Sequence, residues 1–366
     1  MTTSAYIQWV NKYFAALVLQ QVAKVNDPNN PLTYLHRQLL RPEFSVTGTW
    51  KSLSMNNNLV AADIVAMDSP LPLKKRGSLG SATGEIAKMG MEFQLNETQL
   101  TEIDTMIAMN TPEAAIVRYL FQDLPNAITG VYERLEYMFL EALSTGVTVA
   151  TDVNNVGTGI RMDFGYLDAN RFVATTAFDD PASKPFDQIG LMLAKAALDG
   201  NVITQIYTDP QTLVNIGSSD QARQLFAFNQ NFAGDNINIP SLDIDQLNAV
   251  TQRRFGYQFV PIDRSVRVQR NGINIPVKPF KTGAMVGVTT NQLGSYVYAR
   301  LAEMTRPVEG VTYTTAEGFI LASQFRVNRP SLAEFINAQA RVVPVISGVE
   351  AIYTMDSTGT EEIPEG

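Results

Sequence analysis

The residues that could do chemistry in this sequence are few, and most of them are carboxylates. The acid pairs are Asp179 with Asp180, Asp243 with Asp245, and Glu361 with Glu362. Paired carboxylates can serve in acid–base catalysis or bind a metal ion. Adjacent carboxylates on a strand point to opposite faces, however, and the Asp243/Asp245 pair fits a solvated face or a helix start. We therefore expect no catalytic residue and no metal ligand among these pairs.

The cysteine and histidine content excludes most nucleophilic and redox chemistry. The chain has no cysteine, which excludes disulfides, thiolate zinc sites, iron–sulfur clusters and cysteine nucleophiles. His36 is the single histidine, so a Ser-His-Asp triad has one candidate base and a histidine-rich metal cage has none. With Tyr34 and Leu35 beside it, His36 is interpreted as a packed or surface residue rather than a base. We expect no cofactor.

One segment combines positive charge with glycine. Lys74, Lys75 and Arg76 precede the stretch Gly77–Gly84, which has a third glycine at Gly80. This stretch lacks the Gly-Lys-Ser/Thr ending of a phosphate-binding loop, and no amphipathic helix follows it directly, so we interpret it as a flexible loop. The basic triplet could steer nucleic acid or pair with acidic residues of a neighbouring subunit, such as the Glu-rich tail.

Length and charge limit the remaining possibilities. A chain of 366 residues predicts two or three domains, because single cores stop growing near ~250–300 residues. Only 17% of the residues are charged, which leaves surface that could face other subunits. The net charge of −8 argues against a chain-wide phosphate-binding surface. No apolar run approaches the roughly 20 residues of a membrane span, and we expect no signal peptide.

The N-terminal third predicts a helix followed by an irregular region. Apolar residues at helical spacing predict an amphipathic helix over 4–25, which packs on a protein partner or, as the alternative, lies on a membrane surface. Strands are predicted over Val46–Trp50 and Ile64–Met67. Residues 68–88 show no core periodicity, which indicates a functional loop or a long hairpin held by something outside the subunit.

The middle of the chain predicts one long helix. Thr111 is expected as its N-cap and Pro112 as its first helical residue, and apolar residues then recur every three or four positions as far as Gly146. Pro125 is expected to kink this helix of about 30 residues, and Gly130 to weaken it by about 1 kcal/mol.

The second half predicts an α/β region and then further strands. Asp209 is expected to cap a helix that has Pro210 at its first position. Alternating apolar residues around Asn271-Gly272 predict a β-hairpin. The expected elements are strands at Val147–Ala150, Ile160–Phe164, Val202–Tyr207, Ala284–Thr289, Val297–Leu301, Gln324–Val327 and Ala340–Ile346, and a helix at Pro185–Leu198.

The order of these elements resembles the HK-97-like fold of tailed-phage major capsid proteins. Asp63–Gly77 is similar to the approach to the E-loop in the lambda-type members of that fold, and Phe319–Phe335, with Val342–Ile346, is similar to their closing segment. The resemblance implies an α+β fold with an N-arm, an extended E-loop hairpin, a P-domain with a long spine helix and an α/β A-domain. The implied boundaries are an arm at 1–45, the E-loop and its strands at 46–97, the P-domain at 98–165, the A-domain at 166–305, and returning P-domain strands with the tail at 306–366.

The resemblance also implies a function. The chain would be a major capsid protein that self-assembles into hexamers and pentamers of an icosahedral shell around double-stranded DNA, and not an enzyme. Lys74, Lys75, Arg76, Gly77, Gly80 and Gly84 would contact a neighbouring subunit. A separate scaffolding protein, a portal and, optionally, a decoration protein would be its partners, with assembly in the host cytoplasm and a final place in the virion. The alternatives are an encapsulin-like nanocompartment shell and a carboxylate-dependent enzyme.

Overall fold

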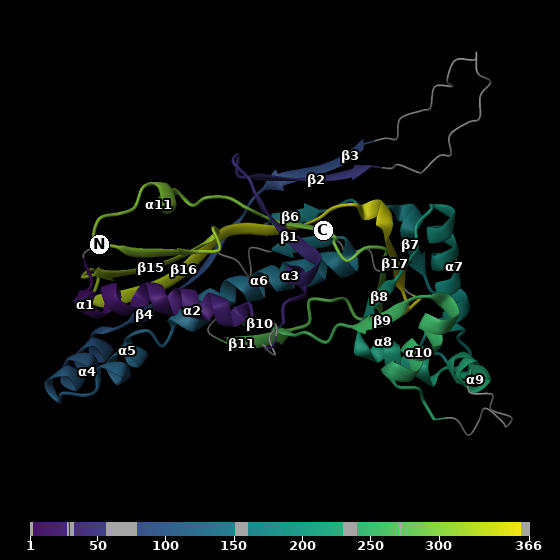
Figure 1. Ribbon diagram of the computed structural model, residues 1–366, viewed down its shortest axis with the longest axis horizontal. Coiled ribbons are helices and arrows are strands. Elements are labelled where there is room, and N and C mark those ends of the chain that lie inside the picture. The colour runs from purple at the N-terminus through teal and green to yellow at the C-terminus, as the bar shows by residue number, and fades with distance from the viewer. Residues whose placement is uncertain are drawn as a thin grey trace, which may run out of the picture. The chain divides into compact units, whose positions relative to one another are not determined.

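The chain folds into two compact units, each assembled from separate stretches of sequence. The computed structural model describes residues 3–27, 29, 33–55, 79–150, 160–229, 240–270 and 273–359. The first unit comprises Met1–Trp50, Thr83–Tyr137 and Ser295–Val345, and the second comprises Lys51–Ala82, Met138–Gly294 and Ile346–Gly366. Figure 1 shows the helices and strands of the chain, which come in runs rather than in regular alternation. None of the helices in the described ranges has the length and apolar character needed to cross a bilayer.

The first unit begins with the predicted amphipathic helix. It consists of α1 (Ile7–Trp9), a π-helical turn η1 (Val10–Phe14) and α2 (Ala15–Val25), with Asn26 as the C-cap. The buried side chains recur every three or four residues, as expected of a helix with one face on a core. They are Trp9, Val10, Phe14, Val18, Val22 and Val25. The prediction of a helix here is therefore confirmed.

A sheet of six strands forms the framework of the first unit. Its strand order is β1-β13-β16-β15-β14, with β4 also paired to β16. The strands are β1 (Leu40–Phe44), β4 (Lys88–Leu95), β13 (Gly294–Tyr298), β14 (Thr312–Ala316), β15 (Ile320–Val327) and β16 (Ala333–Ile346). The strands predicted to start at residues 297, 324 and 340 correspond to β13, β15 and β16, which begin three, four and seven residues earlier than expected.

The long helix of the first unit differs from its prediction in two ways. Pro112, not Thr111, is the N-cap, and the helix breaks after Leu120 into α5 (Glu113–Leu120) and α6 (Leu124–Thr145). Pro125 explains the break, because inside a helix its ring would clash with the carbonyl four residues earlier, whereas the first turn of a new helix tolerates it. The remaining helices of this unit are α3 (Leu35–Leu39), α4 (Glu97–Ala108) and α11 (Ala302–Thr305).

The second unit contains the expected α/β region, built on a mixed five-stranded sheet. The strand order is β7-β17-β12-β8-β9, in which β7 is parallel to β17 and β8 is parallel to β9. The central strand β12 is antiparallel to both of its neighbours. The strands are β7 (Arg171–Val173), β8 (Gln205–Thr208), β9 (Gln258–Pro261), β12 (Ala284–Val288) and β17 (Ile352–Asp356).

The helices of the second unit begin and end where local signals place them. α7 (Pro185–Leu198) has the predicted bounds. α8 (Pro210–Ser218) begins after Asp209, whose carboxylate accepts a hydrogen bond from the Thr212 N–H at 3.0 Å. α9 (Asp220–Asn229) and α10 (Ile244–Phe255) follow, and Asp243 caps α10. Short 3₁₀ turns, η2 (Asp168–Asn170) and η4 (Val349–Ala351), precede β7 and β17.

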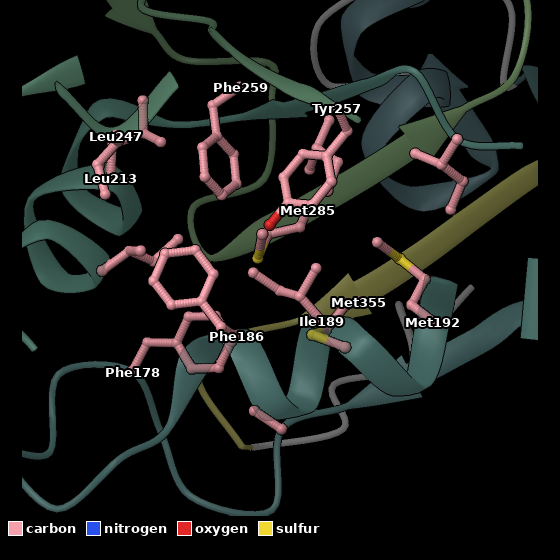
Figure 2. Packing of buried hydrophobic residues seen from close by; sticks show 14 of the residues in the cluster. Phe178, Phe186, Ile189, Met192, Leu213, Leu247, Tyr257, Phe259, Met285 and Met355 are labelled. Atoms are coloured by element: carbon pink, nitrogen blue, oxygen red, sulfur yellow. The ribbon is translucent and has the colours of Figure 1, made fainter. Parts of the chain in front are cut away.

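The core of the second unit lies between α7 and the sheet. Figure 2 shows Phe186 and Ile189 of α7 near Met285 of the central strand β12, with Met192 further along α7. Every residue of β12 is buried, as expected of a central strand. Gly287 of β12 has no side chain, and a Cβ there would lie 3.0 Å from Ile203 and 3.2 Å from Met192, so a larger residue would push α7 away.

Three two-stranded sheets complete the fold. β5 (Val147–Ala150) pairs with β6 (Ile160–Asp163), β10 (Val266–Arg270) with β11 (Ile273–Val277), and β2 (Thr49–Met55) with β3 (Leu79–Glu85). The first two pairs confirm predicted strands, although the Asn271-Gly272 turn lies outside the described residues.

The strand predicted over Val46–Trp50 and the flexible loop predicted over Gly77–Gly84 both need correction, whereas the pairing of β3 with β2 fits the long hairpin that was one of the two expectations for 68–88. Residues 46–48 form a bend because Gly48 has a φ of 73°, and β2 starts only at Thr49. The end of the stretch 68–88 includes β3, whose small residues conceal the strand pattern. The strand predicted over Ile64–Met67 lies outside the described residues.

Candidate assembly surfaces

The predicted E-loop residues fall partly outside the described part of the chain. Lys74, Lys75, Arg76 and Gly77 lie outside it, so their contacts with a neighbouring subunit stay a prediction. Gly80 and Gly84 belong to β3, the strand that returns from the loop. The described strands β2 and β3 lie at the base of the predicted E-loop, and their immediate surroundings are the first candidate surface.

Trp50 and Gly84 pack against each other at this base. Trp50 is only 3% exposed, and a Cβ on Gly84 would lie 2.8 Å from its Nε1 and 3.0 Å from its Cε2. An indole ring cannot bend away as a flexible side chain can, so Gly84 is required for close contact rather than for loop flexibility. The glycine that the sequence marks as a loop residue thus has a packing role in the strand.

Arg341 of β16 donates hydrogen bonds to the backbone just before β2 and just after β3. Its Nε donates to the Ile86 carbonyl at 3.1 Å, and one terminal nitrogen donates to the Gly48 carbonyl at 3.2 Å. The Ile86 N–H donates to the same Gly48 carbonyl at 3.0 Å. A planar guanidinium fixes two carbonyls in one geometry, which a lysine could not do. No local sequence signal marks Arg341, because its partners are more than 250 residues away.

Substituting Gly84 with valine is expected to displace Trp50. The added methyl groups would overlap the indole ring, so the ring must leave its buried position and become exposed to water. The chain has two tryptophans, Trp9 and Trp50. In a Trp9→Phe background, the fluorescence of Trp50 should shift to longer wavelength in G84V. Gly190→Ala is the matched control, since nothing lies within 4 Å of its added carbon, and unchanged emission in both variants would contradict the contact.

The second candidate surface is the docked N-terminal segment. The buried carboxylate of Glu334, on β16, accepts hydrogen bonds from the Ala5 N–H at 2.8 Å and the Ser4 hydroxyl at 3.1 Å. Burial raises the pKa of Glu334 above its ordinary value. The Tyr6 hydroxyl lies 3.1 Å from both the Leu100 carbonyl and an Asp104 carboxylate oxygen. The arm is thus tied to a strand and a helix distant in sequence.

The long helix α6 carries a buried carboxylate that binds His36. Glu136 and His36 are each 1% exposed, and the His36 Nδ1 lies 2.6 Å from a Glu136 oxygen. Glu136 also accepts the backbone N–H groups of Leu35 at 2.9 Å and His36 at 3.1 Å. Burial alone would raise the pKa of Glu136, but the hydrogen bonds and charge of His36 outweigh it and lower that pKa. His36 is therefore a packed residue that fixes α3 on α6.

A second, partly exposed network lies at the end of the N-terminal helix. Arg37 pairs with both carboxylate oxygens of Glu317 at 3.0 Å, and the Tyr132 hydroxyl donates to Glu317 at 2.8 Å. Burial would raise the pKa of Glu317, but the hydrogen bond from Arg37 lowers it. Asn26, at the end of α2, donates to the same carboxylate. Glu317 therefore joins four separate segments of the first unit.

The described carboxylates of the predicted acid pairs do not come together in one site. Asp243 caps α10 in a reciprocal capping box with Gln246, which confirms the interpretation as a helix start. Asp180 accepts the Ala182 N–H in a turn. Glu361 and Glu362 lie outside the described residues. Within the described ranges, no group of three or more His, Cys, Asp or Glu residues could hold a metal ion.

The remaining candidate surfaces are formed by exposed apolar side chains. They lie on several elements of both units. Those at least half exposed are Leu19, Val46, Met109, Leu191, Leu198, Val202, Val214, Phe228 and Ile273. Scattered apolar residues are normal on a surface, but a shell subunit covers many of them with its neighbours.

A match to a protein family decides which function the chain has. Residues 18–260 match the family described as phage major capsid protein E. The chain belongs to this family. It is a shell-forming phage head protein, and its place is the virion capsid. The family match ends before the closing segment at Phe319–Ile346, so that part of the resemblance depends on the fold. No curated protein sequence matches the chain.

Solved structures agree with the family. A prophage protein of Escherichia coli CFT073 assigned as a capsid protein is 13% identical, with a TM-score of 0.56, and the match covers 92% of this chain and 97% of that one. A phage-related protein of Bordetella bronchiseptica RB50 is 9% identical, with a TM-score of 0.50, and the match covers 95% and 98%. The fold is the HK-97-like capsid fold. These findings do not favour the encapsulin-like and enzymatic alternatives.

Proposed function

We propose that this capsid protein assembles into hexamers and pentamers that close into an icosahedral shell around double-stranded DNA. The family match to phage major capsid proteins carries this proposal. Repeated contacts between unlike surfaces of identical subunits close into rings, which is the geometry of such capsomers. The buried contacts of His36 and the ion pair of Arg37 with Glu317 serve the subunit's own stability, and no catalytic role is assigned to any residue.

The proposed domain boundaries are those implied by the resemblance to the HK-97-like capsid fold. The N-arm is 1–45, the E-loop with its strands 46–97, the P-domain 98–165, the A-domain 166–305, and the returning P-domain strands with the C-terminal tail 306–366. Within the last range, β17 belongs to the sheet of the second unit, so the proposed boundary there does not coincide with that of the compact units. Support comes from the first unit, in which Ser295–Val345 joins Thr83–Tyr137 although about 160 residues separate them. A mixed sheet covered by helices, as in the second unit, suits an A-domain.

The proposed role of the E-loop is to reach across a neighbouring subunit. Lys74, Lys75, Arg76, Gly77, Gly80 and Gly84 would contribute to that contact, Gly84 by keeping the base of the loop packed. Support comes from the geometry of the base, where Arg341 and Trp50 anchor strands that pair only with each other among the described residues. An isolated pair of strands is marginally stable in water, so it gains most from a partner.

The proposed partners are the proteins and the DNA that assembly and filling of a phage shell would involve. A separate scaffolding protein would guide assembly in the host cytoplasm, a portal would occupy one vertex, and a decoration protein would bind the outer face. The packaged DNA would be enclosed without sequence-specific binding. A net charge of −8 supports this, because a wall with few free cations neutralises few phosphates and releases few counterions.

Sedimentation velocity tests the proposal. Purified subunits at rising concentration, alone and with a co-expressed scaffolding protein, should convert from a slow species to particles that sediment much faster. The conversion should be cooperative, because each added subunit completes several interfaces at once. A chain that remains monomeric at high concentration under both conditions would overturn the proposal.

A further inference from the structure

The N-terminal end of the described chain is bound by one carboxylate oxygen of β16. Oε1 of Glu334 accepts hydrogen bonds from the Ala5 N–H at 2.8 Å and from the Ser4 hydroxyl at 3.1 Å. The Ser4 oxygen in turn accepts the Tyr6 N–H at 3.1 Å, and the Tyr6 carbonyl accepts the first N–H groups of the helix. The start of the helix, residues 4–9 and here called the arm tip, therefore docks through the acceptor that Glu334 provides.

The other oxygen of this carboxylate is buried and lacks a donor. Oε2 of Glu334 has no hydrogen-bond partner in the described part of the chain, and the side chain is 0% exposed. Gln324, on the same face of β15, is equally buried, and neither polar atom of its amide has a partner there. Burying a carboxylate costs more free energy than burying the neutral acid, most of all where an oxygen lacks a donor. The site therefore suits the neutral acid better than the carboxylate.

The charged groups that face Glu334 do not offset its burial. Arg326 of β15 lies directly across from Glu334, and its positive charge favours the carboxylate. The residue across from Glu334 on β4 is Leu95, which is apolar. On the side of α4, Asp104 adds a negative charge, 3.1 Å from the Tyr6 hydroxyl. Burial outweighs both Arg326 and the hydrogen bonds from the arm tip, and it raises the pKa of Glu334 above its ordinary value.

We propose that Glu334 is a proton-controlled latch, whose neutral acid keeps the arm tip docked and whose carboxylate favours its release. Protonation of Oε2 removes the buried charge and leaves Oε1 to accept the same two hydrogen bonds from Ser4 and Ala5. On release, the proton passes to water and the carboxylate becomes hydrated. The rest of the N-terminal helix stays docked, because it has contacts of its own, such as that of Asn26 with Glu317.

The direction of the pH dependence follows from the two states of the tip. With the tip released, Glu334 meets water and has the ordinary pKa of 4.5, whereas its pKa in the docked state is higher. The docked state therefore binds the proton more tightly. Docking is strongest below pH 4.5 and weakens as the pH rises through the raised pKa of the docked state. The latch belongs to the single subunit and does not depend on the proposed shell.

Hydrogen exchange of dilute, unassembled subunits tests the latch. The amides of Ala5, Trp9 and Val10 donate hydrogen bonds in the docked tip. Their exchange is measured at pH 5 and pH 8 and corrected for the intrinsic effect of pH, so that protection gives the ratio of docked to released tip. In the wild type, protection should be at least about threefold lower at pH 8. Equal protection at both pH values, or higher protection at pH 8, would overturn the inference without any variant.

Two variants assign the effect to this carboxyl group. Glu334→Gln keeps an acceptor for the arm tip but has no proton to lose, so its protection should be the same at both pH values. Glu309→Gln removes an exposed carboxylate of the same unit and should keep the wild-type pH dependence. The amides of β12, in the second unit, should keep their protection throughout, which separates release of the tip from unfolding. Protection that still falls between pH 5 and pH 8 in E334Q would assign the effect to another group and overturn the inference.

Discussion

Replacing Lys74, Lys75 and Arg76 with serine is expected to leave the subunit folded and to raise the concentration for shell assembly at least about tenfold. We propose that these three cations pair with acidic residues of neighbouring copies, and a loss of about 1.4 kcal/mol per interface already gives this factor. Because each subunit repeats the contact, small losses accumulate over the shell. Light scattering of assembling subunits measures the change.

Separate controls must distinguish the effect of the loop's charge on assembly from the effect of its length. Lys12 and Glu113 form an exposed ion pair within the first unit, so Lys12→Ser removes a cation elsewhere and should leave assembly unchanged.

A loop deletion must end before Leu79, because β3 pairs with β2 and Gly84 packs on Trp50. Excising 57–77 and closing the strands with Asn-Gly should give a folded subunit that assembles poorly. Unfolding of this variant would refute the assignment of the loop to neighbouring subunits.

Substituting Glu136 with alanine is expected to lower the free energy of unfolding by about 3–5 kcal/mol. Three donors lose their acceptor: the His36 Nδ1 and the backbone N–H groups of Leu35 and His36. Each donor left unsatisfied in the interior costs about 1–3 kcal/mol. Urea unfolding of the subunit measures the loss. Glu113→Ala breaks an exposed pair and should have little effect.

The same carboxylate gives the subunit an acid-sensitive stability. The pKa of Glu136 is lower in the folded chain than its ordinary value of 4.5. The stability that this shift provides is therefore complete above pH 4.5 and is lost as the pH falls through the folded pKa. In Glu136→Gln, which keeps an acceptor but has no charge to titrate, the stability curve should be flatter in that acidic range. Equal acid sensitivity of wild type and E136Q would contradict the role of the carboxylate.

Local signals in the sequence predict many elements of the fold but few of its long-range contacts. The bounds of α7 and the cap at Asp209 follow from residues that lie next to each other, as do the β10–β11 strands. The break before α6 was misread because Pro125 fits either a kink or a new first turn. The helix α4 was missed although Asn96 and Gln99 form a capping box, a signal that is present in the sequence.

The candidate surfaces could be predicted only in part. Gly84 was identified as an E-loop residue, but its contact with Trp50 depends on the pairing of β2 with β3, which no pattern in the loop reveals. Arg341 and Glu334 form hydrogen bonds with residues that lie hundreds of positions away in the sequence. In the sequence itself, each looks like an ordinary charged residue of a strand. Their roles follow from the topology of the sheet, which brings the arm and the loop base to β16.

The most direct test of the central claim is an electron micrograph of the purified chain after assembly with its scaffolding protein. We predict closed, hollow shells of uniform size, in which hexameric and pentameric units are resolved by averaging. Subunits that remain dispersed, or that form only irregular aggregates while the protein is folded by circular dichroism, would contradict the claim.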